Sequence, residues 1–495
     1  MRKPKLAVER REMQALCAMA AETLLQKRSE RSLHSFLKMV WPVLEPGRSF
    51  TDNWHIHAMC AALEAVAEGR IRRLILSVPY RTSKSTLVGV VFPVWCWLRH
   101  PATRFLTGSH SQTLAVRDAL RARRLLESPL LTTPWGDRLA LAPDQYAKGR
   151  FENANTGYRI AFGVNSGVTG EGGDIIILDD PNTAEAMFSE AARAHTNEFY
   201  DQQLSTRLND PEKSAVVIVQ QRFHPEDLSG HLLEKGGWVN MRLPMMFEPS
   251  DPCVIPEIGF RDPRTQEGEL MWPARFPQAW VEEQKRTLGT YGVAAQLQQR
   301  PAPAGGGLIR LDWFRRYKAL PSRDQWLEVV QAWDTASKAS ELTNAPWVGG
   351  TWVRTETGYY LVRITRRWMT YPEGRRAVTS EYEWCSAHLA PPHAVLIEDK
   401  STGSSLLQEL GDQTSMPLLA VLPEKDKVTR LGIESPAIEA GNVWLPESAE
   451  WLSDFEREIA NFPNASTADQ GDCLSMSLKH FREGGASAGP RLRSL

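Results

Sequence analysis

The stretch that decides the fold is LILSVPYRTSKSTL, residues 74–87. A run of apolar residues enters a turn that closes on Lys84 and Ser85, and a helix-forming pattern follows. A phosphate-binding loop needs this arrangement, because backbone N–H groups, a Lys and a magnesium-binding hydroxyl together bind the phosphates. However, Val78 and Ser83 stand where the two glycines of G-x-x-x-x-G-K-[ST] would be. Taken alone, a surface Lys-Ser turn is an equal alternative.

A second element favours the nucleotide interpretation. The apolar run 175–178 ends in Asp179 and Asp180, so that one acid could bind magnesium and the other could activate water. A further apolar run ends in Gln-Gln-Arg at 220–222, where a γ-phosphate sensor is expected. Because strand ends share one crevice in an open α/β sheet, these groups are expected to converge. The alternative is a core strand that ends in a solvated Asp-Asp turn.

The wider pattern predicts two α/β domains. Four β-rich runs separated by helical stretches predict a mostly parallel sheet with crossover helices, and they lie at 72–78, 103–109, 174–180 and 214–221. Residues 9–40 and 53–66 have helical periodicity, and the Pro- and Gly-rich segment 298–310 is the best linker candidate. Beyond it, WLEVVQAWD, the hairpin APWVGGTWVRT with GYYLVRITRRW, and HAVLIED predict a mixed α/β domain.

Composition sets further bounds. A chain of 495 residues is longer than a single hydrophobic core usually supports, so more than one domain is expected. Because the net charge is only −1, nucleic acid would have to be bound by local basic surfaces. The six cysteines show no C-x-x-C spacing, which argues against a zinc module or disulfide framework and fits a reducing cytoplasm. No apolar segment of about 18 residues occurs and the start lacks a signal-peptide core, so no membrane association is expected.

Acids at strand ends recur in the second half. Asp334 ends one apolar strand, Glu398 and Asp399 end another, and Asp469 and Asp472 lie near the start of the helical DCLSMSLKHF. Divalent cations prefer carboxylate oxygens, and two such ions can stabilise the attacking and leaving oxygens of a phosphodiester. Acids from separate strands and one helix are how an RNase H-like nuclease builds this cluster. The alternative is a set of ordinary solvated strand-end acids.

With these motifs in place, the chain resembles the large terminase subunit of tailed bacteriophages over roughly residues 30–480. The motifs that carry the resemblance are NWHIHAM, SVPYRTSKST, GSHSQTLAVRDALRARRLLESP, GVTGEGGDIIILDDP, QQRFHPEDLSGHLLE, AAQLQQRPAPAGGG, AWDTASK, LIEDKSTG and DKVTR. The resemblance implies an ATP-driven motor that translocates DNA, followed by a nuclease that cuts the packaged genome.

For the first half, the resemblance implies a loop of the form P-P-R-x-G-K-S, with Ser83 in place of the glycine that the family usually retains. Arg81 is then expected near the γ-phosphate and Asp180 is the expected base, whereas Ser85 and Asp179 are the expected magnesium ligands. Trp54 and His55 resemble the adenine-side motif, although His55 could be an ordinary surface histidine. The full set of expected nucleotide-binding residues is Pro79, Arg81, Thr82, Ser83, Lys84, Ser85, Thr86, Asp179, Gln221 and Trp54.

For the second half, the family's E-x-x-x-x-G arrangement matches Glu398 to Gly403 and favours Glu398 over Asp399. The expected metal ligands are Asp334, Glu398, Asp469 and Asp472, and Asp334, Glu398 and Asp472 are the expected catalytic residues. The sequence departs from the family at four places where acids or a histidine are common, namely Asn344, Ala345, Thr467 and Ala468.

Basic residues supply the candidate DNA contacts, which are Arg366, Arg367, Lys425, Lys427 and Arg430. Trp368 is expected in the core and not as a stacking platform. A helical row could supply a finger to a neighbouring subunit or form a solvated face, and it comprises Arg117, Arg121, Arg123 and Arg124.

These inferences predict an ASCE-type P-loop ATPase with a helical extension and a lid over 1–300, a linker over 301–325, an RNase H-like nuclease over 326–485 and a basic tail over 486–495. ATP and Mg²⁺ are the expected cofactors, with Mn²⁺ able to substitute in the nuclease. The expected partners are double-stranded DNA, the portal protein of the procapsid, the small terminase subunit and further copies in a ring of five. The expected location is the host cytoplasm during assembly, not the mature virion.

Two other functions remain open from the sequence. A helicase-nuclease of a restriction or repair system would share the motor and the metal cluster, although no second RecA-like domain is visible before residue 300. A non-catalytic assembly protein could retain the fold after losing the loop glycine, although Lys84, Asp179 and the nuclease acids are all retained.

Overall fold

The computed structural model describes residues 23–142, 147–164, 166, 168, 170–301, 308–335, 346–400, 402–462 and 469–484. Contacts divide the chain into two compact units, Met1–Val281 with Gly292–Ala302 and Glu282–Tyr291 with Pro303–Leu495. The expected tail, 486–495, lies outside the described residues. Each unit has its own sheet and core.

The first unit contains a sheet of order β3-β4-β2-β5-β6-β1-β7. Its strands are β1 (Arg73–Ser77), β2 (Phe105–Ser109), β3 (Arg150–Glu152), β4 (Tyr158–Gly163), β5 (Ile175–Asp179), β6 (Ala215–Gln220) and β7 (Val239–Arg242). Neighbouring strands are parallel except for β3 and β4. Strand β6 therefore separates β1, which enters the Lys-Ser turn, from β5, which ends at Asp179. This is the strand order of an ASCE-type P-loop ATPase fold.

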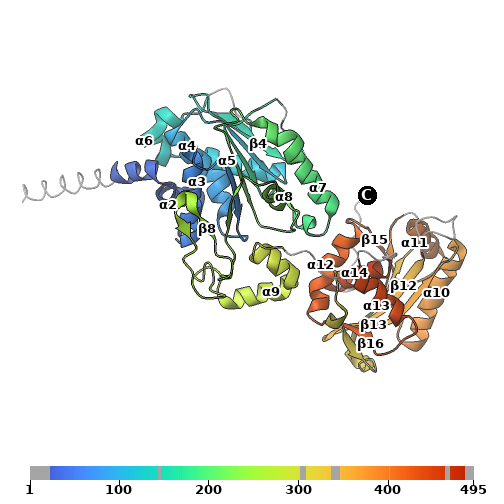
Figure 1. Ribbon diagram of the computed structural model, residues 1–495. Helices are drawn as coiled ribbons and strands as arrows, with labels where there is room; N and C mark the ends of the chain where they lie inside the picture. The colour runs from blue at the N-terminus through green and yellow to red at the C-terminus, as the bar shows by residue number, and fades with distance from the viewer. Residues whose placement is uncertain are drawn as a thin grey trace, which may run out of the picture. The chain divides into compact units, whose positions relative to one another are not determined.

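Helices cover both faces of this sheet (Figure 1). One face carries α3 (Trp54–Ala67), α4 (Phe92–Arg99) and α5 (Gln112–Leu126), and the other carries α7 (Glu190–Phe199) and α8 (Leu228–Lys235). The second face is sealed by a core of strand and helix residues that includes Ile75, Ile176, Phe199 and Leu228. Both layers keep water from the sheet, which explains why its strands are continuously apolar.

The four β-rich runs of the first half are confirmed as β1, β2, β5 and β6. Strand β4 was not predicted, because Arg159 interrupts its apolar pattern. In the fold Arg159 is buried and donates through Nε to Thr107 Oγ1 at 3.2 Å. The helical pattern of 9–40 is broken at Ser32, whose side chain accepts a hydrogen bond from Ser35 N and starts α2 (Leu33–Leu44).

The second unit contains a mixed sheet of order β10-β16-β13-β12-β11-β14-β15. Its strands are β10 (Arg315–Tyr317), β11 (Trp326–Asp334), β12 (Trp347–Thr355), β13 (Gly358–Arg367), β14 (Ala394–Glu398), β15 (Leu418–Val421) and β16 (Val443–Pro446). Strands β11, β12 and β13 form an antiparallel meander, and β14 runs parallel to β11. The predicted strand, hairpin and strand are thus confirmed.

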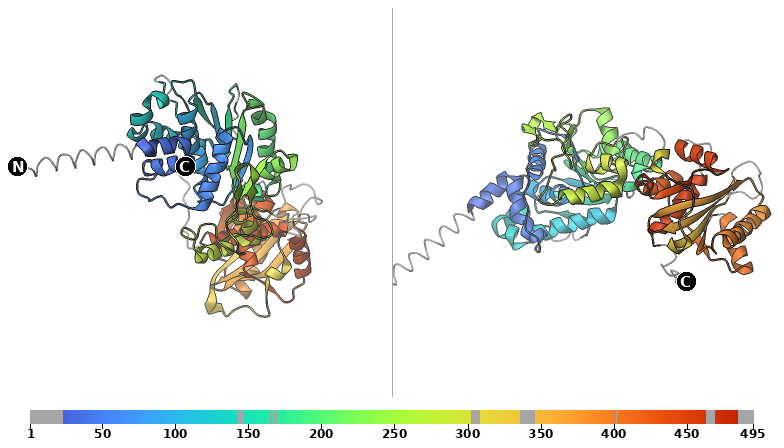
Figure 2. Two further views of the ribbon diagram at one scale, coloured as in Figure 1. Left: turned by 60° about the vertical axis from the view of Figure 1, so that its left-hand side comes forward. Right: turned by 90° about the horizontal axis from the view of Figure 1, so that it is seen from below.

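Helices pack on both faces of the second sheet, as Figure 2 also shows. One face carries α12 (Lys427–Glu439), α13 (Leu452–Asn461) and α14 (Asp469–Arg482), whose apolar residues share a core with Val330, Trp352 and Leu396. The opposite face carries α10 (Tyr371–His388) and α11 (Thr402–Gln413). Helix α14 contacts β11 and β12, and this packing places its first turn beside the end of β11.

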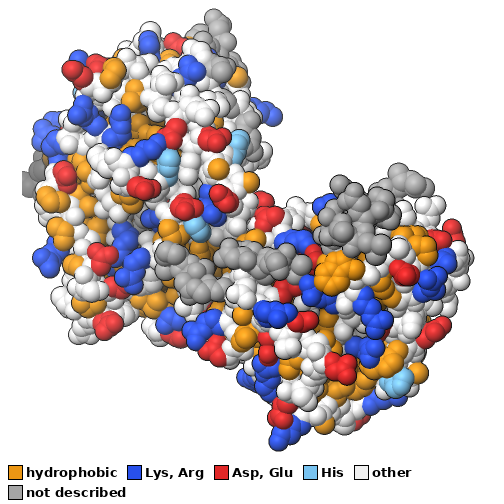
Figure 3. Space-filling model, turned by 45° about the vertical axis from the view of Figure 1, so that its right-hand side comes forward, with side chains coloured by type: hydrophobic (Ala, Val, Ile, Leu, Met, Phe, Trp, Pro, Cys, Tyr) orange, Lys and Arg blue, Asp and Glu red, His pale blue; other side chains and the backbone are white. Residues whose placement is uncertain are grey.

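The surface charges and the state of the cysteines agree with what the amino-acid composition predicts. Basic and acidic side chains are interspersed on the face drawn in Figure 3, in keeping with the net charge of −1. The five cysteines in the described part of the chain are buried and form no disulfide. Among the described helices, none is both long enough and apolar enough to cross a membrane.

Candidate nucleotide and metal sites

The loop after β1 has an unusual backbone. Arg81 and Ser83 have φ angles of 62° and 69°, in the left-handed region that favours glycine. Thr82, between them, donates through Oγ1 to Pro79 O at 2.7 Å and closes the turn. Turns that contain left-handed residues can aim successive N–H groups into one concavity, which makes an anion site. The loop therefore holds two non-glycine residues in the left-handed conformation that such turns use.

The end of β5 lies beside this loop. Lys84 Nζ is 2.8 Å from Asp180 Oδ1, and Ser85 Oγ donates to Asp179 Oδ1 at 3.1 Å. Gln221, just after β6, donates through its backbone N to Asp180 Oδ1 at 3.0 Å. Three strand ends thus meet at one point, as the topology rule predicts.

A cleft of about 680 Å³ opens at this point. Its lining includes six cationic side chains and two acids, an excess of positive charge that suits a polyphosphate. The cations are Arg48, Arg81, Lys84, Arg117, Arg121 and Arg275, and the acids are Glu45 and Asp180. Ser83, Ser85 and Thr86 also line it.

The arginine row of α5 divides in two. Arg117 and Arg121 line the cleft, and Arg121 donates to Thr86 Oγ1 at 3.1 Å and pairs with Glu45 at 2.8 Å. Arg123 pairs with Glu127, and Arg124 is exposed. Arg117 and Arg121 thus belong to the cleft of their own chain, and a finger that reaches a neighbouring subunit stays a prediction.

His55 is a positioning residue whose place the sequence did not reveal. It is fully buried, so the surface-histidine interpretation is wrong. Burial lowers the pKa of His55 to about 4, so the ring is neutral at pH 7. Asn53 Nδ2 donates to His55 Nδ1 at 2.6 Å, which leaves Nε2–H to donate to Thr82 O at 3.2 Å. His55 thereby fixes the loop carbonyl between the two left-handed residues.

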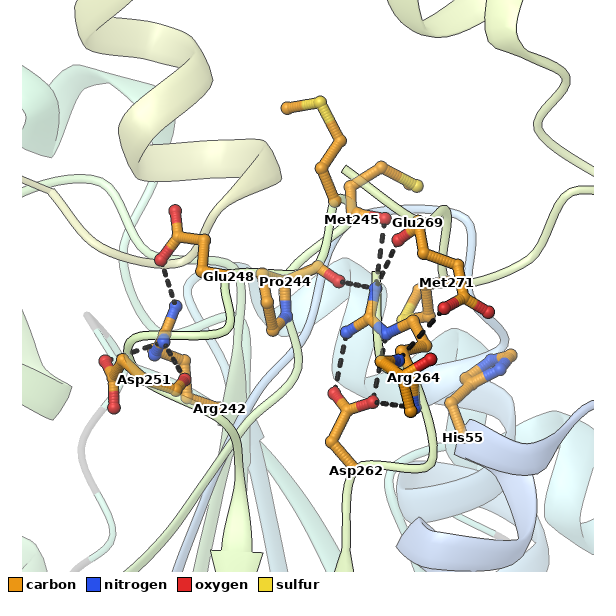
Figure 4. Close-up of polar contacts among 12 residues, drawn as sticks. His55, Arg242, Pro244, Met245, Glu248, Asp251, Asp262, Arg264, Glu269 and Met271 are labelled. Carbon is orange, nitrogen blue, oxygen red and sulfur yellow. Dashed lines mark hydrogen bonds and ion pairs between the residues drawn. The ribbon is translucent and has the colours of Figure 1, made fainter. Parts of the chain in front are cut away.

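Trp54 lies apart from the residues that line the cleft. Its ring stacks on Phe260 at 6.3 Å and packs under the guanidinium of Arg264 at 5.0 Å. Arg264 is itself buried, pairs with Asp262 and donates to the carbonyls of Pro244, Met245 and Glu269 (Figure 4). Trp54 thus anchors the segment that follows β7, and its role in nucleotide binding stays a prediction.

Arg222 also faces away from the cleft lining. Its Nε donates to both carboxylate oxygens of Asp227 at 2.9 Å, and its backbone N donates to Gln299 Oε1 at 2.9 Å. Asp227 in turn caps α8 by accepting from Gly230 N. The end of β6 is therefore joined to Asp180 on one side and to α8 and Gln299 on the other, an arrangement that can transmit a change at the cleft.

The strain at Ser83 gives a testable expectation. A left-handed backbone costs a non-glycine residue about 1–2 kcal/mol, so Ser83→Gly should relieve strain and tighten nucleotide binding without loss of the fold. Calorimetric titration with a non-hydrolysable ATP analogue measures this. Arg81→Gly is the matched control, since it relieves the same backbone strain but removes a cleft cation and should weaken binding. Unchanged or weaker affinity in Ser83→Gly would mean that the serine itself contributes to the site.

Asp179 gives an expectation about pH. Burial, and next the charge of Asp180, raise the pKa of Asp179 to about 8. A magnesium ion there would have to displace a proton below pH 8, so the affinity for magnesium nucleotide should rise with pH and level off above about 8. Each pH unit below that value costs up to about tenfold. Calorimetry in two buffers of different ionisation enthalpy should detect proton release, and Asp179→Asn should abolish it. Equal heats in both buffers would contradict this account.

The second site gathers carboxylates from two strands and one helix. Asp334 ends β11, and Asp469 and Asp472 occupy the first turn of α14, with carboxylate oxygens of all three within 4.8 Å of one another. Glu398 ends β14 and joins the cluster through Arg430, which contacts Glu398 Oε1 at 3.0 Å and Asp472 Oδ1 at 2.8 Å. The structure thus brings together all four acids that were expected to bind metal.

Lys427 and Arg430, predicted as DNA contacts, lie inside this cluster. Lys427 Nζ is 2.6 Å from Asp472 Oδ2, 2.7 Å from Asp469 Oδ1 and 3.5 Å from Asp334 Oδ2. Burial, and next the charge of Asp472, raise the pKa of Asp334 well above its ordinary value. Four carboxylates facing two cations retain excess negative charge, and the oxygen donor set fits a hard divalent ion.

The geometry also separates Glu398 from Asp399. Glu398 is buried and points to Arg430, whereas Asp399 accepts a hydrogen bond from Ser404 Oγ at 2.6 Å on α11. Adjacent strand residues point to opposite faces, so only one can join the cluster. A Cβ on Gly403 would lie 1.9 Å from Glu398 O, which explains the spacing from Glu398 to Gly403. Any side chain at 403 would displace the strand end that carries Glu398.

The remaining basic residues fall in two places. Arg366 and Arg367 end β13, and the register Asp334 to Val348 to Arg366 puts Arg366 two strands from Asp334, about 10 Å away. Trp368, expected in the core, is 51% exposed with Arg366 over its ring at 5.2 Å, so that expectation is wrong. Lys425 instead lines a cleft of about 190 Å³ with Arg430, Lys479 and Arg482.

The four departures from the family pattern, at positions 344, 345, 467 and 468, lie outside the described residues.

Residues 331–480, which include all four acids, match the family model described as the terminase RNaseH-like domain. This match covers less than a third of the chain and lies within the second unit. The large terminase of a thermophilic bacteriophage shares the fold of the chain at 10% identity, with a TM-score of 0.50 over 90% of this chain and 98% of that chain. The predicted fold class, a P-loop ATPase fold followed by an RNase H-like fold, is confirmed.

Two further structures are similar to the chain. The large terminase of the same thermophilic bacteriophage in complex with ATP-gamma-S aligns at 10% identity with a TM-score of 0.49, over 89% of this chain and 98% of that chain. The human cytomegalovirus terminase nuclease domain, Mn soaked and inhibitor bound, aligns at 9% identity with a TM-score of 0.28, over 35% of this chain and 94% of that chain. A comparison with curated proteins finds no match.

Proposed function

We propose that the chain is the large subunit of a tailed-phage terminase, in which ATP hydrolysis drives double-stranded DNA into a procapsid and a metal-dependent endonuclease cuts the concatemeric genome. One observation carries the proposal: a terminase RNase H-like domain with four clustered acids occurs in the same chain as a P-loop fold with Lys84 beside Asp180. Neither half alone would separate a packaging motor from other nucleases or other ATPases.

In the first unit, Lys84 would exchange Asp180 for the β and γ oxygens of ATP, while Arg81 approaches the γ-phosphate from the same loop. Asp180, released from Lys84, is then positioned to accept a proton from the attacking water. Ser85 and Asp179 would bind Mg²⁺, which supplies charge neutralisation for phosphoryl transfer. Gln221, bonded to Asp180 through its backbone, would report the change to α8 through Arg222.

In the second unit, Asp334, Glu398, Asp469 and Asp472 would bind Mg²⁺ or Mn²⁺, which would activate water and stabilise the leaving oxygen of a phosphodiester. Because Lys427 Nζ contacts three of these carboxylates, the Lys427 side chain would have to move when metal binds. It could then contact a DNA phosphate. Arg366 and Arg367, at the same edge of the sheet, would contact phosphates without reading sequence.

The proposed partners are double-stranded DNA, the portal protein of the procapsid, the small terminase subunit and further copies of the chain in a ring of five. The proposed location is the host cytoplasm during assembly. We also propose a motor over 1–300, a linker over 301–325 and a nuclease over 326–485. Contacts differ from these bounds at two places, since residues 282–291 group with the second unit and β10, inside the proposed linker, pairs with β16 of the second sheet.

The test is ATP hydrolysis by the purified chain with linear duplex DNA, with and without empty procapsids that carry the portal. A packaging motor should hydrolyse ATP faster when procapsids are added. A helicase-nuclease should be indifferent to procapsids and should separate DNA strands, and a non-catalytic assembly protein should hydrolyse nothing. Either of these results would overturn the proposal.

A further inference from the structure

A cluster of two imidazoles and one carboxylate lies outside both proposed sites. His34 comes from α2, Asp52 from the loop before α3, and His57 from α3. His34 Nε2 and His57 Nε2 lie 2.9 Å and 3.0 Å from the same oxygen, Asp52 Oδ1. Donor atoms of all three residues lie within 4.8 Å of one another. The proposed ATPase and nuclease chemistry uses none of them.

We propose that His34, Asp52 and His57 bind a late first-row divalent cation, with Zn²⁺ as the preferred ion. Two imidazole nitrogens and one carboxylate oxygen form a borderline-soft donor set that suits such ions, in contrast to the all-carboxylate set of the nuclease, which suits Mg²⁺ or Mn²⁺. The two metal specificities in one chain are therefore separable by experiment.

The distances are close to those that the ion requires. Donors about 2.1 Å from a tetrahedral Zn²⁺ are about 3.4 Å apart, so the two N···O distances would have to open by only about 0.4–0.5 Å. The two rings are stacked, with centroids 3.7 Å apart and planes at 29°, and both Nε2 atoms face Asp52 Oδ1. A rotation of the more exposed His57 ring would make the lone pairs converge.

The contacts to Asp52 are made by the same ring atoms that would bind the ion. Metal binding therefore requires each imidazole to carry its proton on Nδ1, so that the lone pair of Nε2 faces the metal in place of an N–H that faces Asp52 Oδ1. His57 is more than half exposed, which leaves room for water as a fourth ligand. The site would be closed on the α2 side by His34, which is mostly buried.

The positive charge of Lys38 would compete with a metal ion for the carboxylate of Asp52. Its Nζ lies 3.4 Å from Asp52 Oδ2, the carboxylate oxygen that the histidines do not contact. It therefore leaves Oδ1 available to the metal, but its positive charge opposes a divalent cation nearby. Lys38→Met should consequently tighten metal binding, whereas removal of a ligand should weaken it. These opposite signs distinguish a coordination site from general surface charge.

A bound ion would cross-link α2, the following loop and α3. Thr51, next to Asp52, lines the first cleft together with Glu45, Arg48, Ser49 and Phe50 of the same loop. The ring of Phe50 also packs against His34 at 6.2 Å. The metal would thus brace one wall of the proposed nucleotide cleft from outside, as a structural site and not a catalytic one.

The experiment titrates Co²⁺ into the full-length, untagged and chelator-treated protein in excess Mg²⁺, which fills the all-oxygen sites. Visible absorption should report one Co²⁺ with nitrogen ligands, displaced by Zn²⁺. His57→Ala and Asp52→Asn should each weaken binding at least tenfold, and Lys38→Met should tighten it several-fold. His100→Ala, the replacement of an exposed histidine elsewhere, is the matched control and should bind as the wild type does.

Two results would overturn the proposal. One is the absence of a nitrogen-ligand Co²⁺ spectrum in the wild type under these conditions. The other is a spectrum that His57→Ala leaves unchanged or that Lys38→Met weakens as much as His57→Ala does. Because His57 is exposed, its replacement tests the ligand without threatening the fold, and circular dichroism checks this directly.

Discussion

Lys84→Ala is expected to abolish DNA-stimulated ATP hydrolysis, with a loss of at least about 10²–10³-fold in turnover, because preorganised positive charge at a transferring phosphoryl group is worth that much. Lys84 is 4% exposed and is fixed between Asp180 Oδ1 and Val78 O, so its ammonium is already aimed at the head of the loop. Among the described residues, no other lysine lines the cleft. Steady-state hydrolysis at saturating DNA measures the effect.

The control for Lys84→Ala lies in the other unit of the same protein. Metal-dependent cleavage of plasmid DNA should persist in this variant, which would show that the second unit is folded and that the loss is local. Asp179→Ala should behave similarly, since it removes the carboxylate that accepts from Ser85. Wild-type ATP turnover in either variant would refute the assignment of the loop as the nucleotide site.

Asp334→Ala is the second large effect that we expect, here on Mg²⁺- or Mn²⁺-dependent cleavage. Asp334 lies at the end of β11, an interior strand of the sheet, and contributes one of the three carboxylates whose oxygens are within 4.8 Å. Removing it should reduce cleavage by at least about 10²-fold, because the metal ions that it helps to hold supply the charge stabilisation. ATP hydrolysis should survive. Nicking and linearisation of supercoiled plasmid measure the loss.

Glu398 and Asp399 form a matched pair within that experiment. Both are acids at the end of β14, but only Glu398 contacts the cluster through Arg430, whereas Asp399 bonds to Ser404. Glu398→Ala should therefore reduce cleavage more strongly than Asp399→Ala. The reverse order, or a manganese-soaked crystal structure with metal on Asp399 and not on Glu398, would contradict the geometry.

The convergence of the first site was predictable because it depends on topology. Parallel strands end at one edge of a sheet, so a lysine after β1 and acids after β5 must approach each other once the strands are recognised from their apolar runs. Asp334 and Glu398 were expected together from the pattern of RNase H-like nucleases, and the structure supplies the physical reason, because β11 and β14 are parallel neighbours. Most of the candidate site residues were therefore predictable from local sequence patterns that identify strand ends.

Side chains whose place depends on how helices dock could not be predicted. Lys427 begins α12, and its charge looked like a DNA contact in the sequence; only the packing of α12 against α14 directs it into the acidic cluster. For His55 the sequence left an adenine-side residue and a surface histidine both open, and only the fold puts it under the loop carbonyl of Thr82. The prediction for Trp368 was wrong in the opposite sense: a tryptophan is usually largely buried, but this one follows the end of β13 and is exposed.

Protection of DNA inside procapsids tests the central claim most directly. Linear duplex DNA, the purified chain, ATP and portal-bearing procapsids are incubated together, nuclease is added, and the DNA that survives digestion is measured. The account predicts genome-length protected DNA with the wild type and with Asp334→Ala, and none with Lys84→Ala or without ATP. Protection that is independent of ATP and of Lys84, or no protection under conditions where the chain hydrolyses ATP and binds the procapsid, would contradict it.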